Sequence, residues 1–261
     1  MVRSAPNSET LSMTSFRPKL WTGVSAAILL SAVAACSEGG EAGEKGDAAP
    51  AAAVGEGGEG GAEGGAGAGE AGAQGAYLSV PAESRVALRL AHLKGFLLIA
   101  QKQTEGPEAA AALVGQGMIE VHDAQPDAFQ SAGLNVAPLQ KAAQTGAPSD
   151  IAAALSAIEA AQAKAKGDPA AVVKGMVSIA QGLYAGVVVD GGVDPIEYQH
   201  ALGAALAAQQ AAETSADPKV KAAKADLDKL VALFPAPQAP ETPTPAGQVS
   251  AQAARVELAL S

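Results

Sequence analysis

The sequence predicts an all-α protein, in which a bundle of six or seven helices spans residues 77–234 behind a disordered Gly-rich tether. Three observations lead to this prediction. Apolar residues recur every three or four positions through the region, which is the period of a helix face. Proline follows a cap or loop residue at several points, as it does at the first position of a helix. The apolar and polar alternation that marks a strand is absent from the region.

Residues 1–35 have the pattern of a signal peptide. A basic stretch precedes residues 20–35, a mostly apolar run of 16 residues. A membrane-spanning helix needs roughly 20 apolar residues, so the shorter run favours a signal sequence. Met13 is a better candidate start than Met1, because the earlier start adds a polar stretch in front of the basic residues.

Cys36, the only cysteine, follows this run directly. The sequence Val33-Ala34-Ala35-Cys36 resembles the lipobox of bacterial lipoproteins, in which the cysteine sulfur receives diacylglycerol and the cysteine becomes the new N-terminus. The resemblance implies a lipid anchor in the cell envelope, and Ser37 implies the outer membrane, facing the periplasm. A free thiol or an intermolecular disulfide is the alternative, but no nearby cation would activate a thiol.

Residues 36–76 are predicted to be a disordered acidic linker. Glycine occupies 15 of the 37 positions in residues 39–75, and alanine and glutamate fill most of the others. Such a composition cannot bury a core, so we expect a spacer between the anchor and the bundle. The chain has a net charge of −10, which argues against nucleic acid as a partner.

Residues 77–234 supply the helices of the predicted bundle. Helix starts are indicated at Val80-Pro81, Gly106-Pro107, Pro148, Asp168-Pro169, Asp194-Pro195 and Asp217-Pro218. The region is rich in alanine, so we expect the helices to pack closely. One β-branched run, at residues 187–189, precedes Asp190-Gly191-Gly192, and we interpret it as the end of a helix before a turn.

Two segments follow the bundle. Residues 235–246 are predicted to be a Pro-rich linker of polyproline type. Residues 247–261 form a tail or a short docking helix, and the helical spacing of their apolar residues favours the helix. These residues are Val249, Ala253, Val256 and Leu260.

A metal site is the main chemical candidate in the sequence. Glu197 and His200 are three residues apart, which is the spacing of carboxylate and histidine ligands in di-iron helical bundles. With further nitrogen and oxygen donors they would form a site for iron, copper, zinc or another divalent metal. The candidate ligands are His92, Glu120, His122, Asp123, Glu197 and His200.

Each of the main candidates also has a structural interpretation. Glu197 stands at the third position of the helix that starts at Pro195, where a capping-box carboxylate would bind the N–H of the cap residue. His92 lies among apolar residues and fits a core position, and His122 fits an exposed helix end. His200 shares a helix face with alanines, which is compatible with solvent or thin packing.

Catalysis is not expected. The sequence contains no recognisable nucleotide-binding loop, cysteine zinc site or nucleophile elbow. Residues 190–194 combine two acids with glycines but lack the ligand spacing of a calcium loop. We therefore predict that the protein is not an enzyme.

The stretch 184–208, YAGVVVDGGVDPIEYQHALGAALAA, is similar to a helix–turn–helix segment in the periplasmic helical region of Ftr-type iron permeases. The likeness rests on Tyr184, Val188, Gly192, Val193, Glu197 and Tyr198. It implies a helical periplasmic module linked to metal uptake. The iron motif Arg-Glu-Gly-x-Glu of the permeases is absent from the sequence, so transport itself is not expected.

Two functions are compatible with these observations. The first is a lipid-anchored helical protein of the bacterial envelope that binds a protein partner or a small ligand without catalysis. The alternative is a periplasmic metal-binding lipoprotein that passes iron or copper to a transporter.

Overall fold

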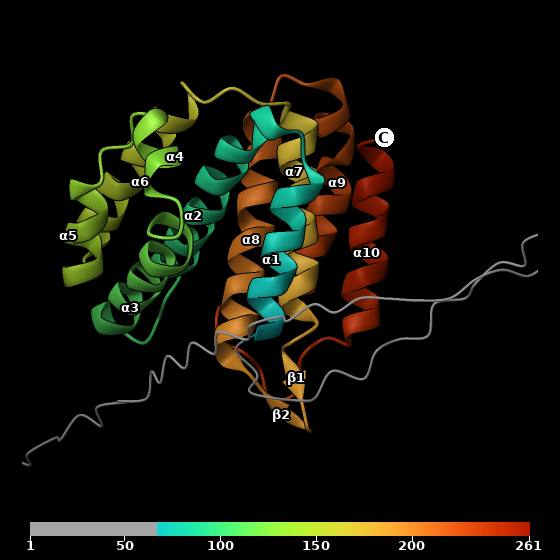
Figure 1. Cartoon of the computed structure of the whole chain (residues 1–261). Helices are drawn as coiled ribbons and strands as arrows, with labels where there is room; N and C mark the ends of the chain where they lie inside the picture. Colours follow the sequence, from blue (N-terminus) through green and yellow to red (C-terminus); the bar gives the residue numbers. More distant parts are fainter. Residues whose placement is uncertain (1–66) are drawn as a thin grey trace, which may run out of the picture. The chain divides into compact units, whose positions relative to one another are not determined.

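The computed structural model describes residues 67–261. Among these residues the all-α prediction is confirmed, and short loops join most helices to the next (Figure 1). The α-helices are α1 (Gly67–Ser79), α2 (Arg85–Gln101), α3 (Pro107–Gly117), α4 (Pro126–Ser131), α5 (Ala137–Thr145), α6 (Pro148–Gln162), α7 (Pro169–Tyr184), α8 (Pro195–Thr214), α9 (Pro218–Ala232) and α10 (Ala246–Ala259). The remaining elements are a 3-10 helix η1 (Ala82–Ser84), a π-helix η2 (Met118–His122) and the strands β1 (Val188–Val189) and β2 (Gly192–Val193).

Proline marks the start of most helices, as predicted. Helices α3, α6, α7, α8 and α9 each begin at a proline that the sequence indicated, and Pro81 precedes η1. In α7, α8 and α9 the aspartate before the proline also caps the helix. Asp194, for example, accepts hydrogen bonds from the N–H groups of Ile196 and Glu197. Residues 77–234 contain more helices than the six or seven predicted. The short helices α4 and α5 are additional, and each has a proline in its first turn.

Helix α1 occupies the last part of the segment predicted to be a linker. It starts at Gly67, ahead of the predicted boundary at residue 77. Glycine disfavours a helix by about 1 kcal/mol relative to alanine, so packing has to stabilise α1. Ala76 and Tyr77 are buried, and α1 packs on α7. The remainder of the 36–76 prediction, like the signal peptide and Cys36, lies outside the described residues.

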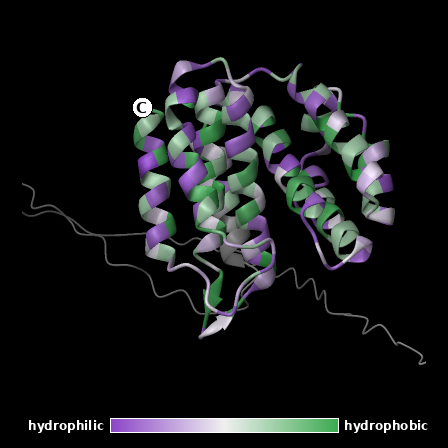
Figure 2. Cartoon of the chain, turned by 180° about the vertical axis from the view of Figure 1, so that it is seen from behind, coloured by the Kyte–Doolittle hydropathy of each residue, from purple (hydrophilic) through white to green (hydrophobic). Residues whose placement is uncertain are grey.

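The prediction of a helix end at residues 187–189 is wrong. Helix α7 ends at Tyr184, and β1 pairs with β2 in an antiparallel hairpin. The turn residues Asp190 and Gly191 have φ angles of 52° and 79°, the left-handed conformation that a two-residue hairpin turn requires. Asp-Gly after β-branched residues is the sequence signal for this turn. The valines of β1 are exposed at the tip of the hairpin, where the strand is coloured as hydrophobic (Figure 2).

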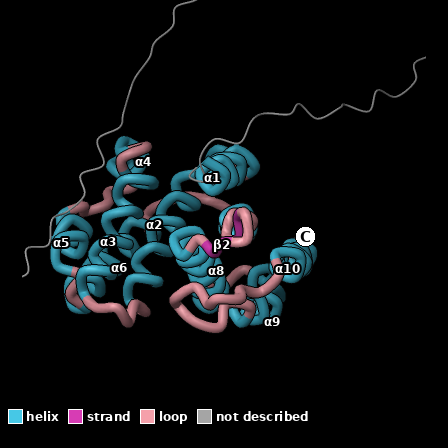
Figure 3. Tube along the Cα trace, turned by 90° about the horizontal axis from the view of Figure 1, so that it is seen from below, coloured by secondary structure: helices cyan, strands magenta, loops and turns pink. Residues whose placement is uncertain are grey.

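Helix α8 lies between α2 on one side and α9 on the other (Figure 3). Its buried residues surround its axis instead of forming one stripe, because α2, α7 and α9 all pack on it. Gly203 of α8 meets Gly95 of α2 at the crossing of the two helices. A Cβ atom added to Gly95 would lie 2.8 Å from the carbonyl oxygen of Gly203, so the two backbones are in direct contact.

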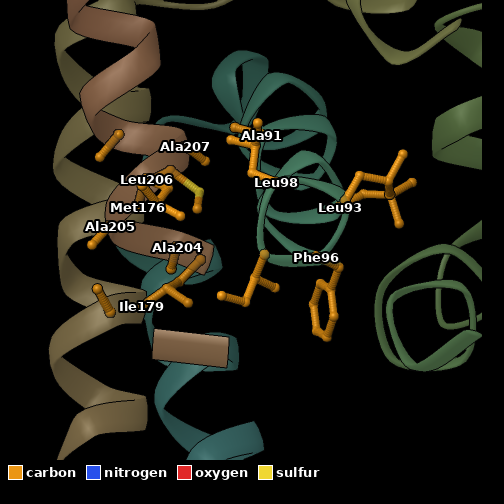
Figure 4. Packing of buried hydrophobic residues seen from close by; sticks show 14 of the residues in the cluster. Ala91, Leu93, Phe96, Leu98, Met176, Ile179, Ala204, Ala205, Leu206 and Ala207 are labelled. Atoms are coloured by element: carbon orange, nitrogen blue, oxygen red, sulfur yellow. The ribbon is translucent and has the colours of Figure 1, made fainter. Parts of the chain in front are cut away.

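Small and medium apolar side chains fill the space around this crossing (Figure 4). Helix α8 contributes Ala204, Ala205, Leu206 and Ala207, helix α7 contributes Met176 and Ile179, and helix α2 contributes Ala91 and Leu98. The close, alanine-rich packing expected from composition is therefore present.

The C-terminal segments are fastened to the bundle. Helix α10 confirms the predicted short helix, and its apolar stripe is buried where it packs on α7 and α9. Residues 235–245 before it have no regular secondary structure. Tyr184 donates a hydrogen bond to the carbonyl oxygen of Thr244 at 2.8 Å, and Tyr198 donates one to that of Ala236 at 2.9 Å. The Pro-rich segment is thus held by two tyrosine side chains of the helical core.

Gly203→Ala is expected to lower the free energy of unfolding by about 1–3 kcal/mol, because the added methyl group would force α2 and α8 apart. Gly115→Ala on α3 is the matched control, since no atom lies within 4 Å of a Cβ atom added there. That substitution should raise stability by about 0.5–1 kcal/mol. Urea denaturation followed by circular dichroism measures both values. Similar effects of the two substitutions would contradict the importance of the crossing.

Candidate functional site

Two of the predicted metal ligands, His92 and His200, belong to a row of buried rings that we call the ring ladder. It consists of Tyr77 of α1, His92 and Phe96 of α2, and His200 of α8. Successive ring centroids are 6.0, 5.4 and 4.5 Å apart. His92 and Phe96 are four residues apart and share one face of α2. The ring ladder therefore joins α1 to α8 across α2.

Hydrogen bonds occupy a ring nitrogen of each ladder histidine. The hydroxyl oxygen of Tyr77 lies 2.6 Å from Nδ1 of His92. Nε2 of His200 lies 3.2 Å from Oε1 of Gln116, and Nδ1 of His200 lies 3.7 Å from Oε2 of Glu120. These contacts connect the ladder to α3 and η2 as well, so both histidines serve the packing of helices.

Burial keeps the ladder rings uncharged near neutral pH. Burial lowers the pKa of His92 to about 3, and the nearby His200 and Arg89 act in the same direction. Burial also lowers the pKa of His200 to about 4, although Asp194 opposes this effect. The pKa of Tyr77 is raised, again chiefly by burial. Protonation of either histidine would place a charge in the apolar interior.

The remaining predicted ligands have other surroundings. Nδ1 of His122 lies 2.6 Å from Oδ1 of its neighbour Asp123. Glu197 is buried at the start of α8. The capping-box interpretation of Glu197 needs correction, because the N–H of the cap residue Asp194 donates to the carbonyl oxygen of Val187 at 2.8 Å.

A metal centre is not assembled by the described side chains. Within residues 67–261, no group of three or more histidine, cysteine, aspartate or glutamate residues is placed to hold a metal ion. No helix in this part of the chain combines the length and apolar character needed to cross a bilayer. Cys36 lies outside it, so lipidation stays a prediction.

A cavity of about 350 Å³, partly open to solvent, lies between α2, α6, α7 and α8. We call it the alanine-lined cavity. Helix α2 contributes Ala87 and Ala91 to the wall, helix α7 contributes Val172 and Val173, and helix α8 contributes Ala207 and Ala211. Sequence reasoning missed this feature. In the sequence the cavity is marked only by Ala87 and Ala91 of α2 and by Ala207 and Ala211 of α8, each pair four residues apart. The sequence does not show that these two helices are neighbours.

The wall of the alanine-lined cavity carries one charged side chain and several uncharged polar ones. Lys94 lines it, and Nζ of Lys94 donates to Oε1 of Glu159 at 2.9 Å. The side chain of Lys94 is only 12% exposed, whereas that of Glu159 is 52% exposed. Gln162 and Thr214 add uncharged polar groups, and none of the lining residues is acidic. The wall therefore suits neutral or anionic molecules better than cations.

No family model, curated protein or solved structure matches the chain. The similarity of residues 184–208 to the permease-associated region stays a prediction. In the structure, Tyr184 and Tyr198 of this stretch bind the Pro-rich segment, and Val188 pairs with Val193 in the hairpin. Packing thus accounts for these aromatic and valine positions.

Lowering the pH from 7 to 5 is expected to destabilise the fold by about 2 kcal/mol for each of His92 and His200. In the unfolded chain each imidazole binds a proton near pH 6.5, whereas the folded pKa values of about 3 and 4 keep the buried rings neutral. The free energy of unfolding is unaffected by these rings above pH 6.5. Below that pH it falls, down to about pH 4 for His200 and about pH 3 for His92. Urea denaturation at a series of pH values measures it.

The variant His92→Gln should lose about half of this pH dependence, because one of the two buried rings is removed. NMR signals of the imidazole Cε1 atoms give a second readout. A free energy of unfolding that is constant between pH 7 and 5, or ladder histidines that titrate above pH 5, would contradict the burial argument.

Proposed function

We propose that this chain is a non-catalytic binding protein of the bacterial envelope, held at the membrane by a lipid on Cys36. Its helical body takes up a small, mostly apolar molecule in the alanine-lined cavity. The cavity is the observation that carries the proposal. Its volume of about 350 Å³ falls in the range of roughly 300–1,000 Å³ that is typical of small-molecule sites. Alanine and valine side chains provide much of its wall.

The chemistry of the cavity wall supports binding without catalysis. Nucleophilic and acid–base catalysis need a base positioned beside the reacting group. Thr214 and Ser215 supply hydroxyl groups, but the lining residues include no histidine, aspartate or glutamate. His92 and His200 belong to the ring ladder, which contributes no residue to the wall.

The anchor is supported by the sequence alone. Val33-Ala34-Ala35-Cys36 has the lipobox pattern, and Ser37 favours sorting to the outer membrane. Two or more acyl chains hold a protein stably at a membrane, whereas one does not. Residues 37–66 would connect this anchor to α1, which begins at Gly67. The cavity would then act at the periplasmic surface of the membrane.

Ala211→Phe is expected to abolish the binding of 1-aminonaphthalene, a small neutral fluorophore whose emission increases in an apolar site. The phenyl ring would fill the part of the alanine-lined cavity that lies between α8 and α2. Ala251→Phe on the exposed face of α10 is the matched control and should bind like the wild-type protein. Fluorescence titration measures binding, and circular dichroism checks folding. Absence of binding to the wild-type protein, or equal binding by both variants, would contradict the proposed site.

Cys36→Ala is expected to prevent fractionation with the outer membrane in a Gram-negative host. Mass spectrometry of the mature wild-type protein should find an acylated Cys36 as its first residue. A wild-type N-terminus without acyl groups would refute the anchor and leave the cavity proposal in place.

A further inference from the structure

Lys94 places a positive charge in the wall of the alanine-lined cavity. It follows Ala91 by three residues, so both project from one face of α2. Lys94 is the one cationic residue among those that line the cavity, and Glu159 is not part of the wall. The cavity thus combines alanine and valine side chains with one cationic residue.

The ion pair between Lys94 and Glu159 leaves room for a second anion. An ammonium group has three N–H donors, and Oε1 of Glu159 accepts one of them at 2.9 Å. The carboxylate of Glu159 is 52% exposed, and pairs of this kind add little to stability. A ligand carboxylate can therefore bind Lys94 beside Glu159 or displace it into solvent.

The volume of the cavity indicates how much of a ligand it can hold. At roughly 30 Å³ for each water-sized group, a volume of about 350 Å³ holds about a dozen non-hydrogen atoms. We propose that the alanine-lined cavity binds an unbranched monocarboxylate of this size, with its carboxylate on Lys94 and its alkyl chain against Ala91, Ala207 and Ala211. The inference rests on the proposed function, because it names the ligand class of the same cavity.

Displacement of 1-aminonaphthalene by octanoate and by 1-octanol tests this inference on the full chain carrying Cys36→Ala, which avoids detergent. The two ligands have the same chain length, and only octanoate is charged. Octanoate should bind about three- to tenfold more tightly than 1-octanol, because it forms a charge-assisted hydrogen bond with Lys94.

Two variants separate the charge effect from a general loss of structure. Lys94→Met should abolish the preference for octanoate over 1-octanol. The ratio of the two affinities is the readout, because a change in the shape of the wall would affect both ligands alike. Glu159→Gln should increase the affinity for octanoate about two- to fivefold, because a repelling carboxylate is removed. The affinity for 1-octanol should not change.

Equal affinities for octanoate and 1-octanol in the wild-type protein would overturn the carboxylate inference and leave the cavity as a binding site. A preference for octanoate that survives Lys94→Met, or an unchanged octanoate affinity in Glu159→Gln, would also overturn it. If the fluorophore itself does not bind, the proposed function fails together with the inference.

Discussion

The contact between Gly95 and Gly203 sets the distance between α2 and α8 at their crossing, and α7 and α9 also pack on α8. Neither residue has a side chain, so the two backbones touch. Alanine, leucine, isoleucine and methionine side chains fill the space around the crossing. Aromatic residues make up 3% of the chain. Stability therefore comes from many small contacts, each of which is sensitive to an added methyl group.

Helix α2 divides the interior into two different environments. His92 and Phe96 lie on the face that builds the ring ladder, where neutral imidazoles hold helices together. Ala87, Ala91 and Lys94 recur at helical spacing on another face, where short side chains leave the alanine-lined cavity. The ring-ladder face is expected to lower the free energy of unfolding in acid, because its buried histidines would have to take up protons. The other face supplies the proposed binding site. Close packing at the glycine crossing and open space nearby thus arise from the same abundance of small residues.

The sequence predicted those features that depend on local chemistry. Proline and the capping aspartates identified the starts of α7, α8 and α9, because they act on adjacent backbone groups. Asp190-Gly191 is an equally local hairpin signal, but the strong helical period of α7 concealed it. Helix α1 was not predictable from its glycine content, because the burial of Ala76 and Tyr77 is a tertiary effect. The described residues do not bring the candidate metal ligands together, and the sequence did not indicate the cavity. Both outcomes have one reason: helical spacing does not show which helices become neighbours.

The proposed binding function depends on a ligand-sized space that alanine packing leaves between α2, α6, α7 and α8. A crystal structure of the full chain soaked with 8-bromooctanoate tests it most directly, because anomalous scattering locates the bromine atom. The bromine is expected between α2 and α8, near Ala207, with the carboxylate at Lys94. A space closed by protein side chains, or bromine found only on the outer surface, would contradict the claim.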